Sequence, residues 1–321
     1  MLLKKIKTNY LDKLFSDLVN KNDFINIDKE LKKLKNNNQE FYHLFLNRVL
    51  NTYFNNDHGQ EFFKNKIIWL NSFDISDTSL IKEFLSFYIN QKTDVNLSPE
   101  PYTDALKNIS KIFKIKQISF EDLVENSFLY QYEILNQTSN KNKLLQSNHA
   151  FFEKLPDKFF THYYLTQCFF YVIKNPIHIY QQYREKYESQ LIALNMISGL
   201  KEDPIQSTEE NSLIIENTNK GWSTNVLSWS NPNVMNTFRG LLIKYEDLMN
   251  NPLQIFAEII SHLIQSGMDI DVDYELIEKF IEKNQHQILT NFNFDISISN
   301  QEKKKITREF GDVLEKFQYK I

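Results

Sequence analysis

The sequence predicts an α/β protein, in which a parallel sheet is flanked by helices and preceded by a helical N-terminal extension. Three short apolar runs support this prediction, at residues 67–70, 169–173 and 241–243. Each run is followed by a polar loop and then by apolar residues at helical spacing. Repeated strand–loop–helix units with apolar strands are typical of parallel sheets covered on both faces. We therefore expect the three runs to be neighbouring parallel strands of one sheet.

The extension occupies residues 1–64. Apolar side chains recur at three-to-four spacing from Leu11 to Leu18, which predicts a helix with one apolar face. At Lys66 the helical spacing of apolar residues gives way to the short apolar run at 67–70. We therefore divide the chain into a helical extension at 1–64 and a main domain at 65–321. The extension carries no residues with informative chemistry, and we expect it to pack on the core or on a protein partner.

Composition limits the function. The 321 residues carry a net charge of −4, with 37 basic and 41 acidic side chains, which argues against a broad nucleic-acid-binding surface. The single cysteine, Cys168, lies in an apolar run; we interpret it as a buried thiol, and the absence of a second cysteine fits a cytoplasmic protein. No apolar stretch has the length of a signal peptide core or a transmembrane helix. No His, Cys, Asp or Glu cluster has metal-ligand spacing.

Four sequence blocks follow one another in the order and near the spacing of a known family. Residues 67–85 fit, without a gap, the pattern I-I-W-L-x-S-Y-P-[KR]-S-G-N-T-W-L-x-x-F-L. Residues 170–182 are similar to I-Y-[IV]-[VL]-R-[DN]-P-x-D-V-x-x-S, residues 222–229 to W-S-x-H-V-x-S-W, and residues 244–252 to [RK]-Y-E-D-L-x-x-[DN]-P. Over roughly residues 66–321 the chain therefore resembles the sulfotransferases, and in particular a divergent member of the bacterial, cytosolic type.

This resemblance implies a P-loop-like sulfotransferase fold and an activity. The activity would be sulfonate transfer from 3′-phosphoadenosine 5′-phosphosulfate to an unknown hydroxyl acceptor, such as a saccharide or a lipid, without a metal. The matching positions give the donor contacts that the resemblance implies. These are the loop residues Ser76, Thr78 and Ser79 for the 5′ end, and Lys174 and Gln182 for the 3′-phosphate.

The loop after the first strand departs from the family pattern at three positions. Asp74 stands at the Pro position, Ile75 at the Lys/Arg position and Asp77 at the Gly position. A basic side chain would neutralise the bridging oxygen as charge develops, and a glycine would let the backbone approach the phosphate closely. A carboxylate repels such an anion, by roughly 3 kcal/mol at about 5 Å. A second interpretation is that Asp77 or Ser76 only caps the following helix.

The 3′-phosphate site keeps one charged position. Lys174 replaces an arginine, which retains the charge but loses the bidentate fork. The alternative is that Lys174 is an ordinary solvated loop lysine. The Arg-Lys-Gly nucleotide clamp of the family is missing from residues 286–294, where we expect it.

An acceptor hydroxyl also needs a general base, usually a histidine. The gapless alignment puts Asn148 at this position, with His149 beside it. A one-residue slip would make His149 the base, but adjacent strand residues point to opposite faces, so the slip requires a local irregularity. The alternative is that His149 is structural.

Two functions therefore remain. The first is a divergent sulfotransferase, and the second is a catalytically inactive protein of the same fold, a pseudoenzyme that acts as a binding or partner module. The substitutions in the donor loop and at the base position leave it open whether the protein is an enzyme.

Overall fold

A computed structural model gives the arrangement of most of the chain. It describes residues 13–18, 20–21, 23–37, 42, 45–46, 49–50, 65–93, 97, 99–113, 117–118, 120–136, 142–151, 153–155, 158–199, 214–215, 221–290 and 298–319. Leu11, and residues 291–294 of the segment where we expected the nucleotide clamp, lie outside the described residues.

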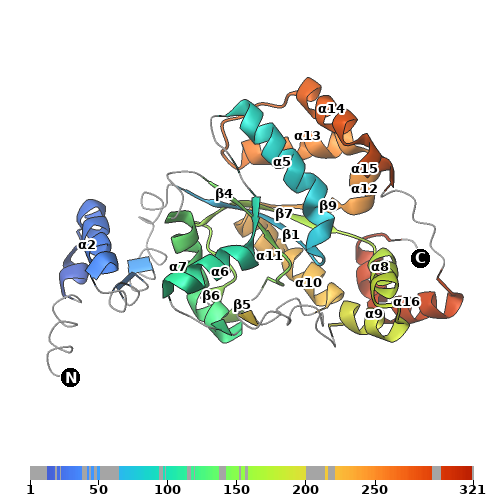
Figure 1. Ribbon diagram of the computed structural model, residues 1–321, viewed down its shortest axis with the longest axis horizontal. Coiled ribbons are helices and arrows are strands. Elements are labelled where there is room, and N and C mark those ends of the chain that lie inside the picture. Colours follow the sequence, from blue (N-terminus) through green and yellow to red (C-terminus); the bar gives the residue numbers. More distant parts are fainter. Residues whose placement is uncertain are drawn as a thin grey trace.

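A five-stranded sheet forms the centre of the molecule (Figure 1). Its order is β2 (Pro99–Pro101), β4 (Lys143–Ser147), β1 (Ile67–Ser72), β7 (Thr166–Ile173) and β9 (Gly240–Lys244). Every neighbouring pair is parallel. The expected fold class is confirmed, and the three apolar runs are the adjacent strands β1, β7 and β9.

Two minor sheets each contain two short strands. β3 (Gln117–Ile118) pairs in parallel with β8 (Ile214–Ile215), and β5 (Glu153–Leu155) pairs in antiparallel orientation with β6 (Lys158–Phe159).

Helices cover both faces of the main sheet, and the sheet separates the core into two layers. The first layer contains α5 (Ser79–Lys92), α12 (Tyr245–Asn250), α13 (Pro252–Gln265), α14 (Tyr274–Lys283) and α15 (Gln285–Thr290). The second contains α6 (Tyr102–Phe113), α7 (Phe120–Asn136), α8 (Pro176–Tyr187), α9 (Gln190–Ile197), α10 (Trp222–Trp229), α11 (Pro232–Thr237) and α16 (Asn300–Lys316). Successive side chains of a strand point to opposite faces of the sheet, so each strand contributes to both layers. In β1, Ile68 and Leu70 face the first layer and Trp69 faces the second.

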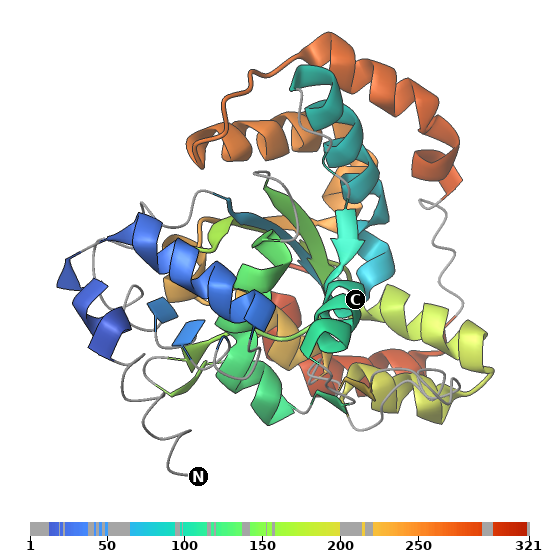
Figure 2. The same cartoon turned by 60° about the vertical axis from the view of Figure 1, so that its left-hand side comes forward.

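The extension contributes to the second layer. Residues 13–18 are helical, and α2 spans Phe24–Asn37. Buried side chains such as Ile27 belong to the same core cluster as α6 and α7, and the Tyr42 hydroxyl donates to the buried Glu133 carboxylate of α7. Figures 1 and 2 show α2 at the side of the molecule where α6 and α7 lie. The boundary at residue 65 stays a prediction.

The order of the strands places a topological switch point between β1 and β7, and we call the buried region at their carboxyl ends the switch-point crevice. The chain leaves β1 through a short 3-10 helix, η1 (Ile75–Thr78), into α5 of the first layer, and leaves β7 into α8 of the second layer. Neighbouring parallel strands whose following helices lie on opposite faces mark the topological switch point, where open α/β sheets usually bind ligands. A ligand site is therefore expected at the carboxyl ends of β1 and β7. None of the described helices is both long and apolar enough to cross a membrane.

Candidate functional site

The loop after β1 satisfies its own backbone donors. The Asp74 side chain accepts from the Ser76 backbone amide at 3.0 Å and from the Ser76 hydroxyl at 2.7 Å, and so caps η1. The Asp77 amide donates to the Asp74 carbonyl oxygen at 3.0 Å. The interpretation that Asp77 or Ser76 caps the following helix is wrong, because the capping side chain is Asp74, and Thr78, which precedes α5, makes no side-chain cap. The Ser76 and Asp77 backbone amides, which a phosphate would need here, are therefore already bonded within the loop.

The other two loop hydroxyls differ in burial. Thr78 is buried; its hydroxyl donates to the Ile75 carbonyl oxygen at 2.7 Å and accepts from the Gln146 side-chain amide at 2.7 Å. Ser79 is half-buried, and its backbone amide donates to the Ser76 carbonyl oxygen. The Thr78 hydroxyl therefore links η1 to β4 rather than facing solvent.

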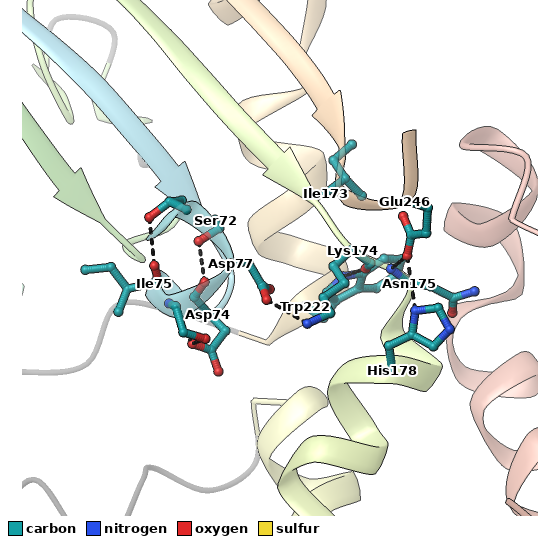
Figure 3. Close-up of polar contacts among 12 residues, drawn as sticks. Ser72, Asp74, Ile75, Asp77, Ile173, Lys174, Asn175, His178, Trp222 and Glu246 are labelled. Atoms are coloured by element: carbon teal, nitrogen blue, oxygen red, sulfur yellow. Dashed lines mark hydrogen bonds and ion pairs between the residues drawn. The ribbon is translucent and has the colours of Figure 1, made fainter. Parts of the chain in front are cut away.

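Asp77 and Lys174 form a buried ion pair across the crevice. Lys174 Nζ lies 2.8 Å from Asp77 Oδ1, and the two side chains are 2% and 4% exposed. The ammonium also lies 4.5 Å from the centre of the Tyr245 ring, close enough for a cation–π contact. The alternative interpretation of Lys174 as a solvated loop lysine is wrong, since folding removes it from water. Figure 3 shows the two side chains pointing toward each other.

Burial and the Lys174 ammonium have opposite effects on the pKa of Asp77. Burial raises the pKa of the Asp77 carboxyl to about 7, although the Lys174 ammonium opposes this shift, and the Asp74 carboxylate adds to it. Removing both charged groups from water costs free energy, and only a close contact in good geometry offsets this cost.

Several contacts fix the turn that carries Lys174. Trp222 Nε1 donates to the Lys174 carbonyl oxygen at 3.1 Å. The next residue, Asn175, caps α8 through its side chain, and Pro176 occupies the first turn of that helix, where its missing amide costs nothing. Gln182, the other predicted 3′-phosphate residue, is exposed on α8.

Glu246 joins this turn to the C-terminal segment. Its Oε1 accepts from the Asn175 backbone amide at 2.9 Å and lies 3.2 Å from Nδ1 of His178. The Tyr319 hydroxyl lies 3.1 Å from Oε2 and also 3.1 Å from the Ile173 carbonyl oxygen. Burial alone would raise the pKa of Glu246, but the hydrogen bonds from His178 and the Asn175 amide outweigh it and lower the pKa. The carboxylate is therefore the stable form.

His149 lies in an aromatic environment beyond the end of β4. Its ring makes an edge contact with Tyr102, with centroids 6.0 Å apart, and tilts against Phe160. Its carbonyl oxygen accepts from Trp229 Nε1 at 2.8 Å. Burial lowers the pKa of His149 to about 4, so the ring is neutral near neutral pH. Its role as a base stays a prediction.

A polar chain that the sequence did not reveal lies beside Asn148. The Asn225 side chain donates to the Asn148 carbonyl oxygen at 2.8 Å and accepts from the Tyr171 hydroxyl at 2.7 Å. The sequence marks Asn225 as a departure from the pattern, because it stands at the His position of the third sequence block. Only the fold shows the residues that Asn225 contacts. Among the described residues, no group of three potential ligands could hold a metal ion.

Of the predicted site residues, the fold brings Lys174 to the loop that carries Ser76, Thr78 and Ser79. Gln182 is instead exposed on α8, and His149 packs among aromatic rings beyond the end of β4. As donor ligands, all of these residues stay predictions.

Asn71, near the end of β1, is fully buried, and neither its side-chain nitrogen nor its side-chain oxygen has a hydrogen-bond partner among the described residues. Burying unsatisfied polar atoms costs about 1–3 kcal/mol. We expect Asn71→Val to raise the free energy of unfolding by about that amount, since valine suits a strand and carries no polar atoms. Chemical denaturation measures the change. The exposed Asn233 offers a control, because Asn233→Val should change stability by less than about 0.5 kcal/mol. A less stable Asn71→Val variant would contradict the prediction.

Comparisons with known proteins add the following. No protein-family model matches the sequence, and no curated protein sequence matches it. The crystal structure of mouse sulfotransferase SULT7A1 complexed with PAP is 13% identical, with a TM-score of 0.43, over 78% of this chain and 85% of that one. Retinol dehydratase in complex with androsterone and inactive cofactor PAP is 12% identical, with a TM-score of 0.39, over 77% and 80%. Similarity at this level assigns neither a family nor an activity to the chain.

Proposed function

We propose that this chain is a non-catalytic protein of sulfotransferase type, whose donor crevice is closed by its own carboxylates and which acts as a binding or partner module. The observation that carries the proposal is the buried ion pair between Asp77 and Lys174, 2.8 Å across the switch-point crevice. The basic side chain that the resemblance assigns to a donor phosphate, Lys174, is thus paired with a carboxylate of its own chain.

The loop supports the same conclusion. A phosphosulfate group would need the Ser76 and Asp77 amides, and both donate to Asp74. It would also approach the Asp74 and Asp77 carboxylates, each of which repels it by roughly 3 kcal/mol at about 5 Å and an effective dielectric of about 20. The residues present therefore do not fit the donor as the structure holds them.

The second candidate is a divergent sulfotransferase acting on a saccharide or lipid hydroxyl. Two observations favour it: the four sequence blocks occur in family order, and Lys174 lies at the carboxyl edge of the sheet beside a helix-start loop. In that case the Asp77–Lys174 pair must separate before the donor binds. A protein partner that binds residues 1–64 would be part of the non-catalytic function, in which the chain acts as a partner module.

Isothermal titration calorimetry with 3′-phosphoadenosine 5′-phosphate separates the two. At about pH 8, above the pKa of Asp77, we expect no measurable binding by the native chain, because losing each charge-assisted contact costs about 1.5–3 kcal/mol. Micromolar or tighter binding, or transfer of labelled sulfonate to an acceptor, would overturn the proposal.

The matched positive control is a chain with the family residues restored. Ile75→Lys, Asp77→Gly and Asn148→His together should give measurable nucleotide binding, because they supply the loop cation and remove the internal carboxylate. Far-ultraviolet circular dichroism would verify that this variant keeps its fold.

A further inference from the structure

We propose that the outer edge of β9 is a self-association surface, on which β9 of a second copy of this chain pairs in antiparallel orientation about a two-fold axis at Leu242. The main sheets of the two copies then join into one continuous sheet. This inference goes beyond the proposed function and does not depend on it, because the edge of β9 includes neither Asp77 nor Lys174.

The backbone of β9 directs hydrogen-bonding groups away from β7. The Phe169 amide donates to the Arg239 carbonyl oxygen at 3.2 Å, and the register sets Phe169 opposite Gly240. Successive residues of a strand direct their backbone groups to opposite sides, so the amide and carbonyl groups of Gly240 and Leu242 point outward, as does the Lys244 amide. Within the part of the chain that the structure describes, none of these outward groups has a hydrogen-bond partner.

Burial differs between β9 and the inner strand β1. All six residues of β1 are buried, whereas in β9 only Ile243 is buried and the others are half-buried. Leu241 packs against the first layer and Leu242 against the second, and both keep part of their surface exposed. Apolar side chains of both layers therefore reach solvent at this edge.

The opposite edge of the sheet is protected against pairing. Its strand β2 consists of Pro99, Glu100 and Pro101, and the two prolines lack the amide hydrogens that another strand would need. By contrast, β9 contains no proline, and its one charged side chain, Lys244, lies with its ammonium 5.3 Å from the centre of the Tyr319 ring. Edges without prolines or projecting charges are suited to pairing with another chain.

The outward groups of β9 complement those of a second, antiparallel copy. A two-fold axis at Leu242 sets its amide and carbonyl groups opposite the same groups of the second copy, so each Leu242 both donates and accepts. The Lys244 amide then meets the Gly240 carbonyl oxygen on each side of the axis, and no two charges lie opposite each other. Because a pair of five-residue strands covers less area than a permanent interface needs, we expect a reversible dimer.

Sedimentation velocity of the full chain, from about 1 µM to about 100 µM, measures this association. The native chain should change from monomer to dimer as the concentration rises. Leu242→Lys and Leu242→Glu, each measured alone, should weaken the association by at least about tenfold, because like charges directly opposite each other in an antiparallel pair are destabilising. An equal mixture of the two variants should restore it, since residue 242 then meets the opposite charge across the axis.

Leu191→Lys and Leu191→Glu are the matched controls. Leu191 lies on α9 and is 66% exposed, so these substitutions make the same changes of charge outside β9 and should leave the association unchanged. A native chain that stays monomeric over the whole concentration range overturns the inference. So does a dimer that both Leu242 variants leave intact, or a mixture that associates no better than each variant alone.

Leu242→Cys gives a second measurement in case the charged variants do not fold. Residues that form a hydrogen-bonded antiparallel pair have Cα atoms about 5.5 Å apart, which is within the range of a disulfide. With oxidised glutathione, Leu242→Cys should form a covalent dimer faster than Leu191→Cys, and the native chain should form none, since its single cysteine, Cys168, is buried. Equal rates for the two cysteine variants overturn the inference.

Discussion

Lys174→Met is expected to lower the free energy of unfolding by about 3–5 kcal/mol, because removing one member of a buried ion pair leaves the other charge uncompensated. Methionine fills nearly the same space as the lysine stem, so the loss of charge dominates over the loss of packing. Urea denaturation monitored by tryptophan fluorescence measures the change. Lys143→Met is a suitable control, because its ion pair with Glu100 is partly exposed and should contribute no more than about 1 kcal/mol.

The Lys174→Met effect should depend on pH. Without the ammonium, the pKa of Asp77 rises further, since burial then acts unopposed. A group whose folded pKa exceeds its unfolded pKa binds more protons in the folded state, so stability falls as the pH rises between the two values. The variant should therefore lose most stability above about pH 7 and recover part of it in acid. In the double variant with Asp77→Leu, much of the loss should disappear, and a simple sum of the two single effects would contradict the coupling.

Glu246→Ala is expected to lower the free energy of unfolding by about 3 kcal/mol or more. The carboxylate accepts from the Asn175 amide and lies within hydrogen-bond distance of His178 and Tyr319. Hydrogen bonds to a charged group contribute about 1.5–3 kcal/mol each, and the donors left behind are largely buried. Thermal unfolding measures the loss.

Two further variants identify the cause. Glu246→Gln keeps an acceptor for the Asn175 amide and should cost less than the alanine change, while Tyr319→Phe removes one donor only and should cost about 1 kcal/mol. The pKa of Glu246 is lowered in the folded protein, so its contribution to stability is fully present above its ordinary pKa of 4.5 and is lost as the pH falls from there through the lowered pKa. An alanine variant as stable as the native chain at neutral pH would show that the C-terminal segment is held by packing alone.

Much of the fold followed from local sequence signals. The apolar runs that became β1, β7 and β9 predicted parallel buried strands, because strands covered on both faces have no polar side to show. Pro176 and Pro252 lie in the first turns of α8 and α13, where the fixed backbone angle of proline suits a helix start, which is an equally local relation between sequence and structure.

The site was harder to predict. The sequence pointed to Lys174, Asp74 and Asp77 as departures from a pattern, but it gave each residue a separate role. Asp74, Ser76 and Asp77 are near neighbours in the sequence, and each could cap a helix start. Which of them does so depends on the backbone angles of η1, which the sequence does not specify. The contacts of Tyr171 with Asn225 and of Glu246 with Tyr319 link residues far apart in the chain, and no periodic pattern encodes them.

The sequence by itself predicted the parallel α/β architecture and showed the positions at which the chain departs from the sulfotransferase pattern, because both depend on which side chains stand at which positions. Only the tertiary structure decided that Asp77 and Lys174, 97 positions apart, neutralise each other out of contact with water. The physical reason is that the order of the strands sets β1 beside β7, and this order is the outcome of packing two layers of helices on one sheet.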